Sequence, residues 1–175
     1  MVKRSDVDEL FRVLCESRGG WNRRLLPGMV DFFALVTQVD DPDGEVPLLH
    51  ALSALGSAVN AHQMGLLLDW QEAPLLEARC WDLVESTVGL PDEYWFEPDR
   101  FTKFAWEGSD VGQGLKAFDR WLVEDNVEFR GPDPWRIVNV DTGSDFYVVL
   151  LCDQNHVDVI AQLRALGMTG HLVNE

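Results

Sequence analysis

Carboxylates and one histidine gather near the C-terminal end of the chain, where together they could hold a metal ion. They are Asp141, Asp145, Asp153, His156 and Asp158. Carboxylate oxygens and imidazole nitrogens are ligands for Mg²⁺, Mn²⁺ or Zn²⁺. Asp141 and Asp145 lie in a turn-like segment, and Asp153 lies about seven residues, or roughly 23 Å, further along a strand. Asp153 and His156 are the only compact pair. A small metal-dependent enzyme centred on them is one hypothesis, although Asp153 is more typical of a helix cap.

The three cysteines, Cys15, Cys80 and Cys152, are far apart and form no C-x-x-C pair. Their odd number and their spacing exclude a disulfide framework and a cysteine-rich zinc site. Cys152 stands four residues before His156, so a thiolate nucleophile could meet a base there. Cys152 ends an apolar run, and buried thiols are usually inert, so we do not interpret it as a nucleophile. We assign no catalytic residue to the chain and expect no cofactor.

The string from Val138 to Ser144 contains Asp141-Thr142-Gly143-Ser144 and resembles the active-site signature of aspartic proteases. The resemblance implies two such carboxylates sharing one proton, the second of which a homodimer could supply. It also implies a lobe with most of its strands after the aspartate, yet only 34 residues follow Asp141. Since these four residue types are typical of hairpin loops, we interpret the string as a turn.

Two further motifs fail on their sequence context. Gly112-Gln113-Gly114 with Ala117 is similar to the G-x-G-x-x-A motif of dinucleotide-binding proteins. No strand precedes it, and Glu107 and Asp110 would repel a phosphate, so we expect the glycines to allow close helix packing. Asp41-x-Asp43-x-Glu45 resembles the start of a calcium loop, but the glycine and glutamate that an EF-hand needs further on are missing. We expect an acidic turn there.

Apolar residues at helical spacing dominate the N-terminal half. They predict a first helix that Ser5 caps and Gly19-Gly20 ends, and further helices over 27–36, 47–61, about 72–86 and 109–122, the last capped by Ser109. Gly65 to Trp70 is short and apolar, which indicates a buried strand. The charge-free stretch 46–68 is long enough to span a bilayer, but its eight polar or helix-breaking positions favour a buried core helix instead.

The C-terminal end has the pattern of a sheet. Residues 135–140 alternate, 141–145 are turn-like, and 146–152 are continuously apolar, which predicts a hairpin whose second strand is central. A short helix that Gly167 ends and a strand over 170–173 follow. The sequence therefore predicts an α+β fold, with a helical N-terminal half packed on a small, mostly antiparallel C-terminal sheet, in a single domain over 1–175.

Several short segments from about residue 60 to the end resemble a family of small bacterial proteins that is classed only as a domain of unknown function. They are Leu66-Leu67-Leu68-Asp69-Trp70, Phe101 to Phe104 before a helix, Val140 to Tyr147, and a helix ending in Leu166-Gly167. The resemblance implies an α+β fold and a bacterial source, and it implies no activity or site residues.

Composition and charge narrow the possible functions. The chain is 46% hydrophobic with 7 Trp, which is typical of a folded domain rather than an acidic disordered tail. A net charge of −16 argues against binding nucleic acid or an anionic membrane surface. No apolar segment follows the basic N-terminus as in a signal peptide, so we expect a cytoplasmic protein with reduced thiols.

The negative charge is unevenly distributed. Residues 1–30 carry 6 basic and 4 acidic residues, whereas residues 31–175 carry 8 basic and 26 acidic ones. Eight acids and seven aromatic residues alternate within 81–110, a pattern that suits a cationic protein partner, since charge steers association and buried rings supply affinity. Alternatively, the aromatics are a small local core and the acids a solvated face. We expect the partner contacts at Asp92, Glu93, Trp95, Glu97 and Asp99.

The leading hypothesis is therefore a non-enzymatic acidic binding protein. Its most concrete version is a bacterial immunity or inhibitor protein that covers the basic cleft of a partner such as a toxin. The alternatives are the metal-dependent enzyme centred on Asp153 and His156, and a subunit that self-associates through exposed aromatic residues.

Overall fold

The computed structural model describes residues 1–16, 24–87, 103–124, 135–152 and 156–175, and the structural statements below concern these ranges. The strands of the main sheet are β3 (Gly65–Asp69), β4 (Arg136–Asp141), β5 (Phe146–Cys152) and β6 (Thr169–Leu172). They form one antiparallel sheet in the order β3–β5–β4–β6. With the helices around it, this sheet makes the fold α+β, as the sequence predicts.

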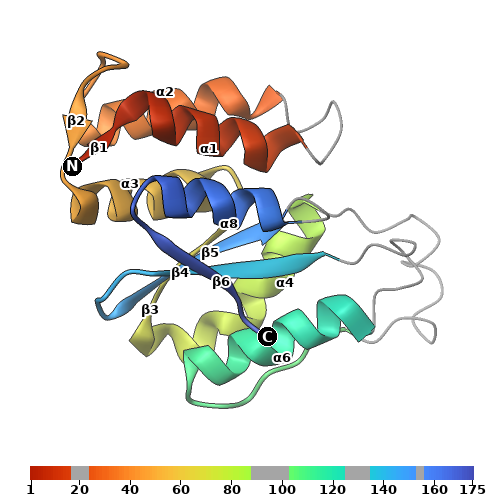
Figure 1. Ribbon diagram of the computed structural model, residues 1–175. Coiled ribbons are helices and arrows are strands. Elements are labelled where there is room, and N and C mark those ends of the chain that lie inside the picture. Colours follow the sequence, from red (N-terminus) through yellow and green to blue (C-terminus); the bar gives the residue numbers. More distant parts are fainter. Residues whose placement is uncertain (17–23, 88–102, 125–134, 153–155) are drawn as a thin grey trace.

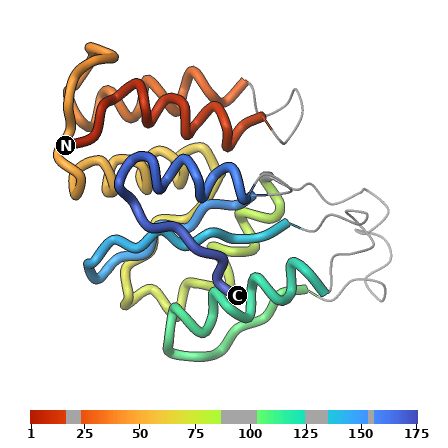
Figure 2. Tube along the Cα trace, viewed as in Figure 1, coloured from red at the N-terminus to blue at the C-terminus, as the bar shows by residue number. Residues whose placement is uncertain are grey.

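Helices cover both faces of the sheet (Figure 1). One face carries α3 (Leu48–Ala61) and α8 (His156–Ala165), and the other carries α4 (Leu76–Thr87) and α6 (Val111–Glu124). A further layer, α1 (Arg4–Glu16) and α2 (Leu26–Thr37), lies over α3 and α8. The short strands β1 (Val2–Lys3) and β2 (Glu45–Val46) pair antiparallel. They connect the start of α1 to the segment between α2 and α3. Figure 2 shows the N-terminus in the outer helical layer and the C-terminus beside α6.

The central strand β5 explains the continuous apolar run in the sequence. Val148 and Leu150 pack into the core beneath α3 and α8, while Val149 and Leu151 pack into the core beneath α4 and α6. A strand with neighbours on both edges and helices on both faces has no solvent-facing side, so polar alternation is lost. The prediction of a hairpin with a central second strand is confirmed.

The α3 helix lies close to this sheet because its contact face is built from small residues. Ala51, Ala54 and Ala58 are buried, and a Cβ added to Gly56 would lie 2.8 Å from Cγ2 of Val148. The charge-free stretch in the sequence therefore folds mainly as this buried helix and the start of β3, as expected.

The structure corrects some of the predicted helix boundaries. The α1 helix begins at Arg4, so Ser5 lies inside it rather than capping it; the backbone N–H groups of both residues donate to carbonyls of Gly44 and Pro42, at 3.0 and 2.9 Å. The distant 40–44 loop thus starts this helix, which local sequence does not show. The α6 helix begins one residue later than a Ser109 cap would place it, because Asp110 Oδ1 accepts the Gln113 N–H at 2.7 Å.

Candidate functional site

The residues that the sequence singles out for partner binding, Asp92, Glu93, Trp95, Glu97 and Asp99, lie outside the described residues. So does Asp153, while His156 is half-buried at the first position of α8. Across the described ranges, no group of three His, Cys, Asp or Glu side chains is placed to hold a metal ion. The contacts and the Asp153–His156 metal site therefore stay predictions.

The protease-like string is a hairpin turn between β4 and β5. Asp141 Oδ1 accepts the Gly143 N–H at 2.9 Å, and the Thr142 hydroxyl donates to the Phe146 carbonyl at 2.7 Å. Gly143 has φ +60°, the left-handed conformation that glycine adopts without strain. The Asp141 and Thr142 side chains thus bind backbone groups of the turn and of the strand that follows it. The interpretation of the string as a turn is confirmed.

The dinucleotide-like glycines sit in α6 after the irregular segment 103–110, where the motif requires a strand. A Cβ added to Gly114 would lie 2.1 Å from Cδ2 of Leu76 and 2.9 Å from Nε1 of Trp106. At Gly112 the nearest atom would be the Asp110 carboxylate, at 3.3 Å. Gly114 therefore allows close packing, as expected, and Gly112 has more room.

The cysteines offer no accessible nucleophile. Cys15, Cys80 and Cys152 are all buried. Burial raises the pKa of the Cys80 thiol, because an apolar surrounding disfavours the thiolate. A catalytic cysteine needs the opposite environment, partly exposed and electropositive.

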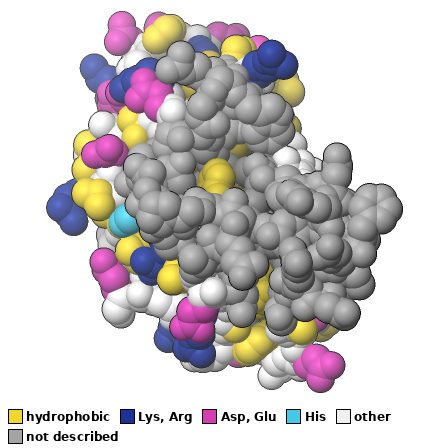
Figure 3. Space-filling view, turned by 90° about the vertical axis from the view of Figure 1, so that its right-hand side faces the viewer, with side chains coloured by type: hydrophobic (Ala, Val, Ile, Leu, Met, Phe, Trp, Pro, Cys, Tyr) yellow, Lys and Arg dark blue, Asp and Glu magenta, His cyan; other side chains and the backbone are white. Residues whose placement is uncertain are grey.

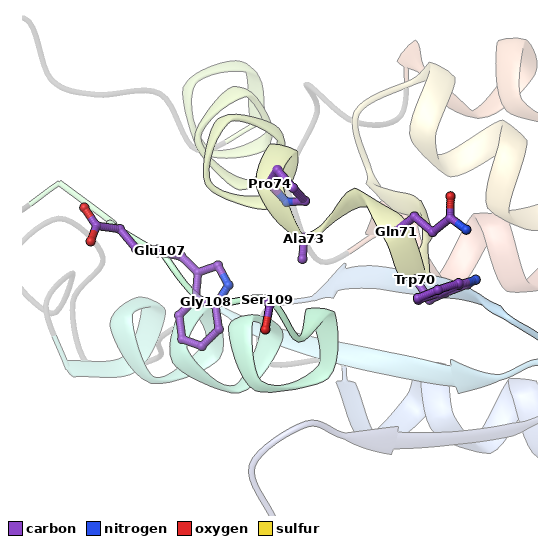
Figure 4. Close-up of a pocket in the computed structure, with 8 residues that line it drawn as sticks. Trp70, Gln71, Ala73, Pro74, Glu107, Gly108 and Ser109 are labelled. Carbon is purple, nitrogen blue, oxygen red and sulfur yellow. The ribbon is translucent and has the colours of Figure 1, made fainter.

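A pocket of about 500 Å³ lies between η2 (Trp70–Leu75), the 3₁₀ helix after β3, and the segment that leads into α6 (Figure 4). It is lined by Trp70, Gln71, Ala73, Pro74, Trp106, Glu107, Gly108 and Ser109. Its volume falls within the range of sites that bind small molecules. The sequence predicts an α-helix from about residue 72, whereas the structure has the 3₁₀ helix η2 up to Leu75 and begins the α-helix α4 at Leu76.

Hydrogen bonds to its neighbours hold the η2 side of the pocket in place. Asp69 caps η2 by accepting the Gln71 N–H at 2.9 Å, and Glu72 accepts the Asp69 N–H at 2.6 Å. The Trp70 N–H donates to the Asp145 carbonyl in the β4–β5 turn, at 3.1 Å. The Trp70 backbone is thus fixed, while its side chain remains 55% exposed.

The opposite wall is fixed through Trp106. Its backbone N–H donates to Glu77 Oε2 on α4 at 2.8 Å. A Cβ added to Gly108 would lie 2.2 Å from Cζ2 of the Trp106 indole, and one added to Gly114 would lie 2.9 Å from Nε1 of the same ring. Only glycine at both positions lets the indole lie where it does. The two walls are therefore preformed, which reduces the entropy lost on binding.

Of the eight lining residues only Glu107 is charged, and its carboxylate points away from the other lining residues (Figure 4). Glu107 lines it and is exposed, and none of the eight lining residues is Lys or Arg. The exposed carboxylates of Asp69 and Asp110 directly flank the two lining segments in the sequence. Figure 3 shows the molecule turned by 90° from Figure 1. Along the edge of that view, the described charged side chains are both basic and acidic. The pocket therefore has aromatic walls, from Trp70 and Trp106, with exposed carboxylates close by in the sequence.

The sequence analysis names none of the eight lining residues as a partner contact. Trp106 and Glu107 belong to the acidic, aromatic segment that the sequence singles out. Trp70 was interpreted only as the end of a buried strand. The available signal was the Asp69-x-x-Glu72 capping pair, which ends β3 and turns Trp70 outward.

A second hollow, of about 280 Å³, lies over a structural ion pair rather than a binding site. Asp119 on α6 is buried and accepts the Ile137 N–H at 2.9 Å, Arg136 Nη2 at 3.1 Å and Asn174 Nδ2 at 3.1 Å. Arg136 also donates to the Asn174 carbonyl at 3.2 Å. These bonds tie α6, β4 and the C-terminal residues together.

No family model, curated protein or solved structure matches this chain. The resemblance to a bacterial family therefore stays a prediction. Within the described part of the chain, none of the helices has the length and apolar character needed to cross a membrane.

Proposed function

We propose that this protein is a non-enzymatic binding protein whose acidic surface on the α4–α6 side receives a basic partner protein. The observation that carries the proposal is the preformed pocket lined by two tryptophans, with the exposed acids Asp69, Glu107 and Asp110 in or next to its lining segments, in a chain of net charge −16. Charge complementarity speeds encounter, and buried aromatic surface supplies affinity. Trp106 and Glu107, which line the pocket, belong to the acidic and aromatic segment 81–110 that the sequence analysis singles out.

The most concrete version is an immunity or inhibitor protein of a bacterial cytoplasm that covers the basic cleft of a toxin. A protein that blocks such a cleft needs a rigid, negatively charged surface and no catalytic group of its own. The hydrogen-bonded walls of the pocket and the excess of acids over bases in the chain support this version.

The test compares two variants with the same net charge. One neutralises four exposed acids on the proposed side, and is written Asp82→Asn, Glu85→Gln, Glu107→Gln and Asp145→Asn. The control neutralises four exposed acids elsewhere, and is written Asp31→Asn, Asp43→Asn, Glu45→Gln and Asp158→Asn. The wild type and both variants are immobilised and used to capture proteins from the source cells at low salt. Each captured protein is identified, purified and titrated against all three.

We expect a basic protein that binds the wild type and the control variant alike, and the first variant at least about tenfold more weakly, since each exposed charge pair contributes up to about 1 kcal/mol. Equal loss in both variants would show that only total charge matters. Binding of no basic protein would contradict the proposed function.

A further inference from the structure

One edge of the main sheet is formed by an apolar strand. The β3 strand pairs with β5 on one side only, and its residues 65–68 carry no charge. Alternate residues of an antiparallel edge strand direct their backbone N–H and C=O groups away from the sheet, and in β3 Leu67 and Asp69 do so. An edge of this kind is a template on which another strand can pair.

In β3 these outward backbone groups are bonded to side chains. Asn60 Oδ1 accepts the Leu67 N–H at 3.3 Å, and Arg79 Nη2 donates to the Leu67 carbonyl at 3.0 Å. Glu72 Oε2 accepts the Asp69 N–H at 2.6 Å. The three side chains therefore occupy the positions that the backbone of a further strand would need.

The same three side chains, Asn60, Glu72 and Arg79, are bonded to one another, and we call them the edge cluster. Arg79 Nη2 donates to Asn60 Oδ1 at 2.6 Å, and Arg79 Nη1 donates to Glu72 Oε1 at 2.8 Å. Asn60 comes from α3 on one face of the sheet, and Arg79 comes from α4 on the other face (Figure 1). The guanidinium thus reaches across the sheet edge with a planar fork of donors, which a lysine ammonium does not reproduce.

Packing and partial burial hold the edge cluster in place. The side chains of Arg79 and Glu72 are 28% and 26% exposed, so their ion pair is less screened by water than a fully exposed one. A Cβ added to Gly56 would lie 2.9 Å from Cδ1 of Leu67, which shows how closely β3 packs on the helix that carries Asn60. The cluster is therefore fixed relative to the strand that it covers.

We propose that the edge cluster closes β3 against pairing with a second copy of this chain. Every molecule carries the same edge, and two β3 strands related by a two-fold axis would pair antiparallel through the same residues. A cluster that only tied the helices together would affect stability and leave association unchanged. The inference goes beyond the proposed function, because it concerns contacts between copies of this chain rather than a basic partner.

The test opens the edge without changing the net charge. The edge variant combines Asn60→Ala with Arg79→Lys, and the control combines Ser53→Ala with Arg120→Lys, at exposed positions on α3 and α6. Hydrogen exchange of individual backbone amides is followed by nuclear magnetic resonance over a wide range of protein concentrations. The salt concentration is about 300 mM, which screens the repulsion between two acidic molecules. Sedimentation velocity is measured on the same samples.

In the wild type and the control, we expect the Leu67 amide to exchange at the same rate at every concentration. In the edge variant at low concentration it should exchange about tenfold faster, because it has lost its acceptor. At high concentration its exchange should slow again as β3 strands pair, and the sedimentation coefficient should rise. The Leu68 amide faces β5 and should exchange slowly throughout, which reports that the fold is intact.

The inference is overturned if the edge variant associates no more than the control, or if it associates without protection of the Leu67 amide. It is also overturned if the Leu67 amide of the wild type becomes more protected as concentration rises, since the edge would then be open. Fast exchange of the Leu68 amide would show that the edge variant does not fold. In that case Asn60→Ala alone is compared with Ser53→Ala alone, with the same expected and contradicting results at Leu67.

Discussion

Replacement of Asp119 by alanine tests the clearest energetic feature of the fold. The Asp119 carboxylate is 1% exposed and accepts hydrogen bonds from Arg136, Asn174 and the Ile137 backbone. Truncation leaves the Ile137 N–H without its acceptor and the Arg136 guanidinium without its counter-ion. It also detaches the C-terminal residues from α6, because Asn174 loses one of its two bonds to that helix.

The magnitude follows from the burial of the two partners. Removing one member of a buried ion pair costs about 3–5 kcal/mol. Arg136 is 20% exposed and can regain part of its hydration, so the lower end applies, about 3 kcal/mol. For a chain of this length, each kcal/mol lowers the melting temperature by about 2–4 °C, which gives a drop of roughly 6–12 °C.

Urea unfolding and scanning calorimetry measure this loss directly. Arg120→Ala is the matched control, because Arg120 is the next residue on α6 and is exposed; we expect a change within about 0.5 kcal/mol. If Asp119→Ala unfolds at the same urea concentration as the control, then the carboxylate does not hold α6 to β4 as described. A loss confined to Asp119→Ala, and reduced when Arg136→Met is added, would support the pairwise account.

Two further predictions concern packing and pH. Gly114→Ala should lower the free energy of unfolding by about 1–3 kcal/mol, since its Cβ would meet the Trp106 ring. Gly112→Ala should raise the free energy of unfolding by up to about 1 kcal/mol, because alanine has the higher helix propensity. Equal effects of the two substitutions in thermal melts would contradict this contrast. Burial raises the pKa of Asp8 above its usual 3.8, more than Arg4 lowers it, so the native state binds the proton more tightly and stability falls as pH rises through that pKa. Asp8→Asn should therefore be more stable than the wild type near pH 7 and no more stable below about pH 3, as urea titrations at several pH values would show.

The sheet hairpin shows what sequence alone can establish. The alternation over 135–140, the turn at Asp141 to Asp145 and the apolar run that follows each reflect local chemistry, and together they place two strands correctly. The burial of Phe146–Cys152 on both faces is encoded in its own residues. The same holds for the left-handed glycines: Gly143 lies within the turn and Gly167 follows the end of α8, as expected.

Features that depend on distant partners were missed. The β1–β2 ladder pairs two-residue strands whose own sequence shows no strand pattern, and it exists because residues 40–46 return to the start of α1. The start of α1 at Arg4 has the same cause. Single-sequence patterns do not contain such contacts, since they are formed only when the chain folds.

The candidate site also has one part that local sequence indicates and one part that depends on distant contacts. The sequence identifies an acidic and aromatic segment, which supplies Trp106 and Glu107, because composition is visible without a fold. It does not place Trp70 opposite them, because that depends on the antiparallel pairing of β3 with β5 and on the bond from Trp70 to the Asp145 carbonyl.

The most direct test of the central claim is the salt dependence of the complex between this protein and its purified basic partner. Calorimetric titrations from about 50 to 300 mM salt should show affinity falling steeply for the wild type, because opposite charges are increasingly screened. They should show a distinctly shallower fall for the variant that lacks Asp82, Glu85, Glu107 and Asp145. An affinity that is indifferent to salt, or equal slopes for the two proteins, would contradict an acidic docking surface on the α4–α6 side.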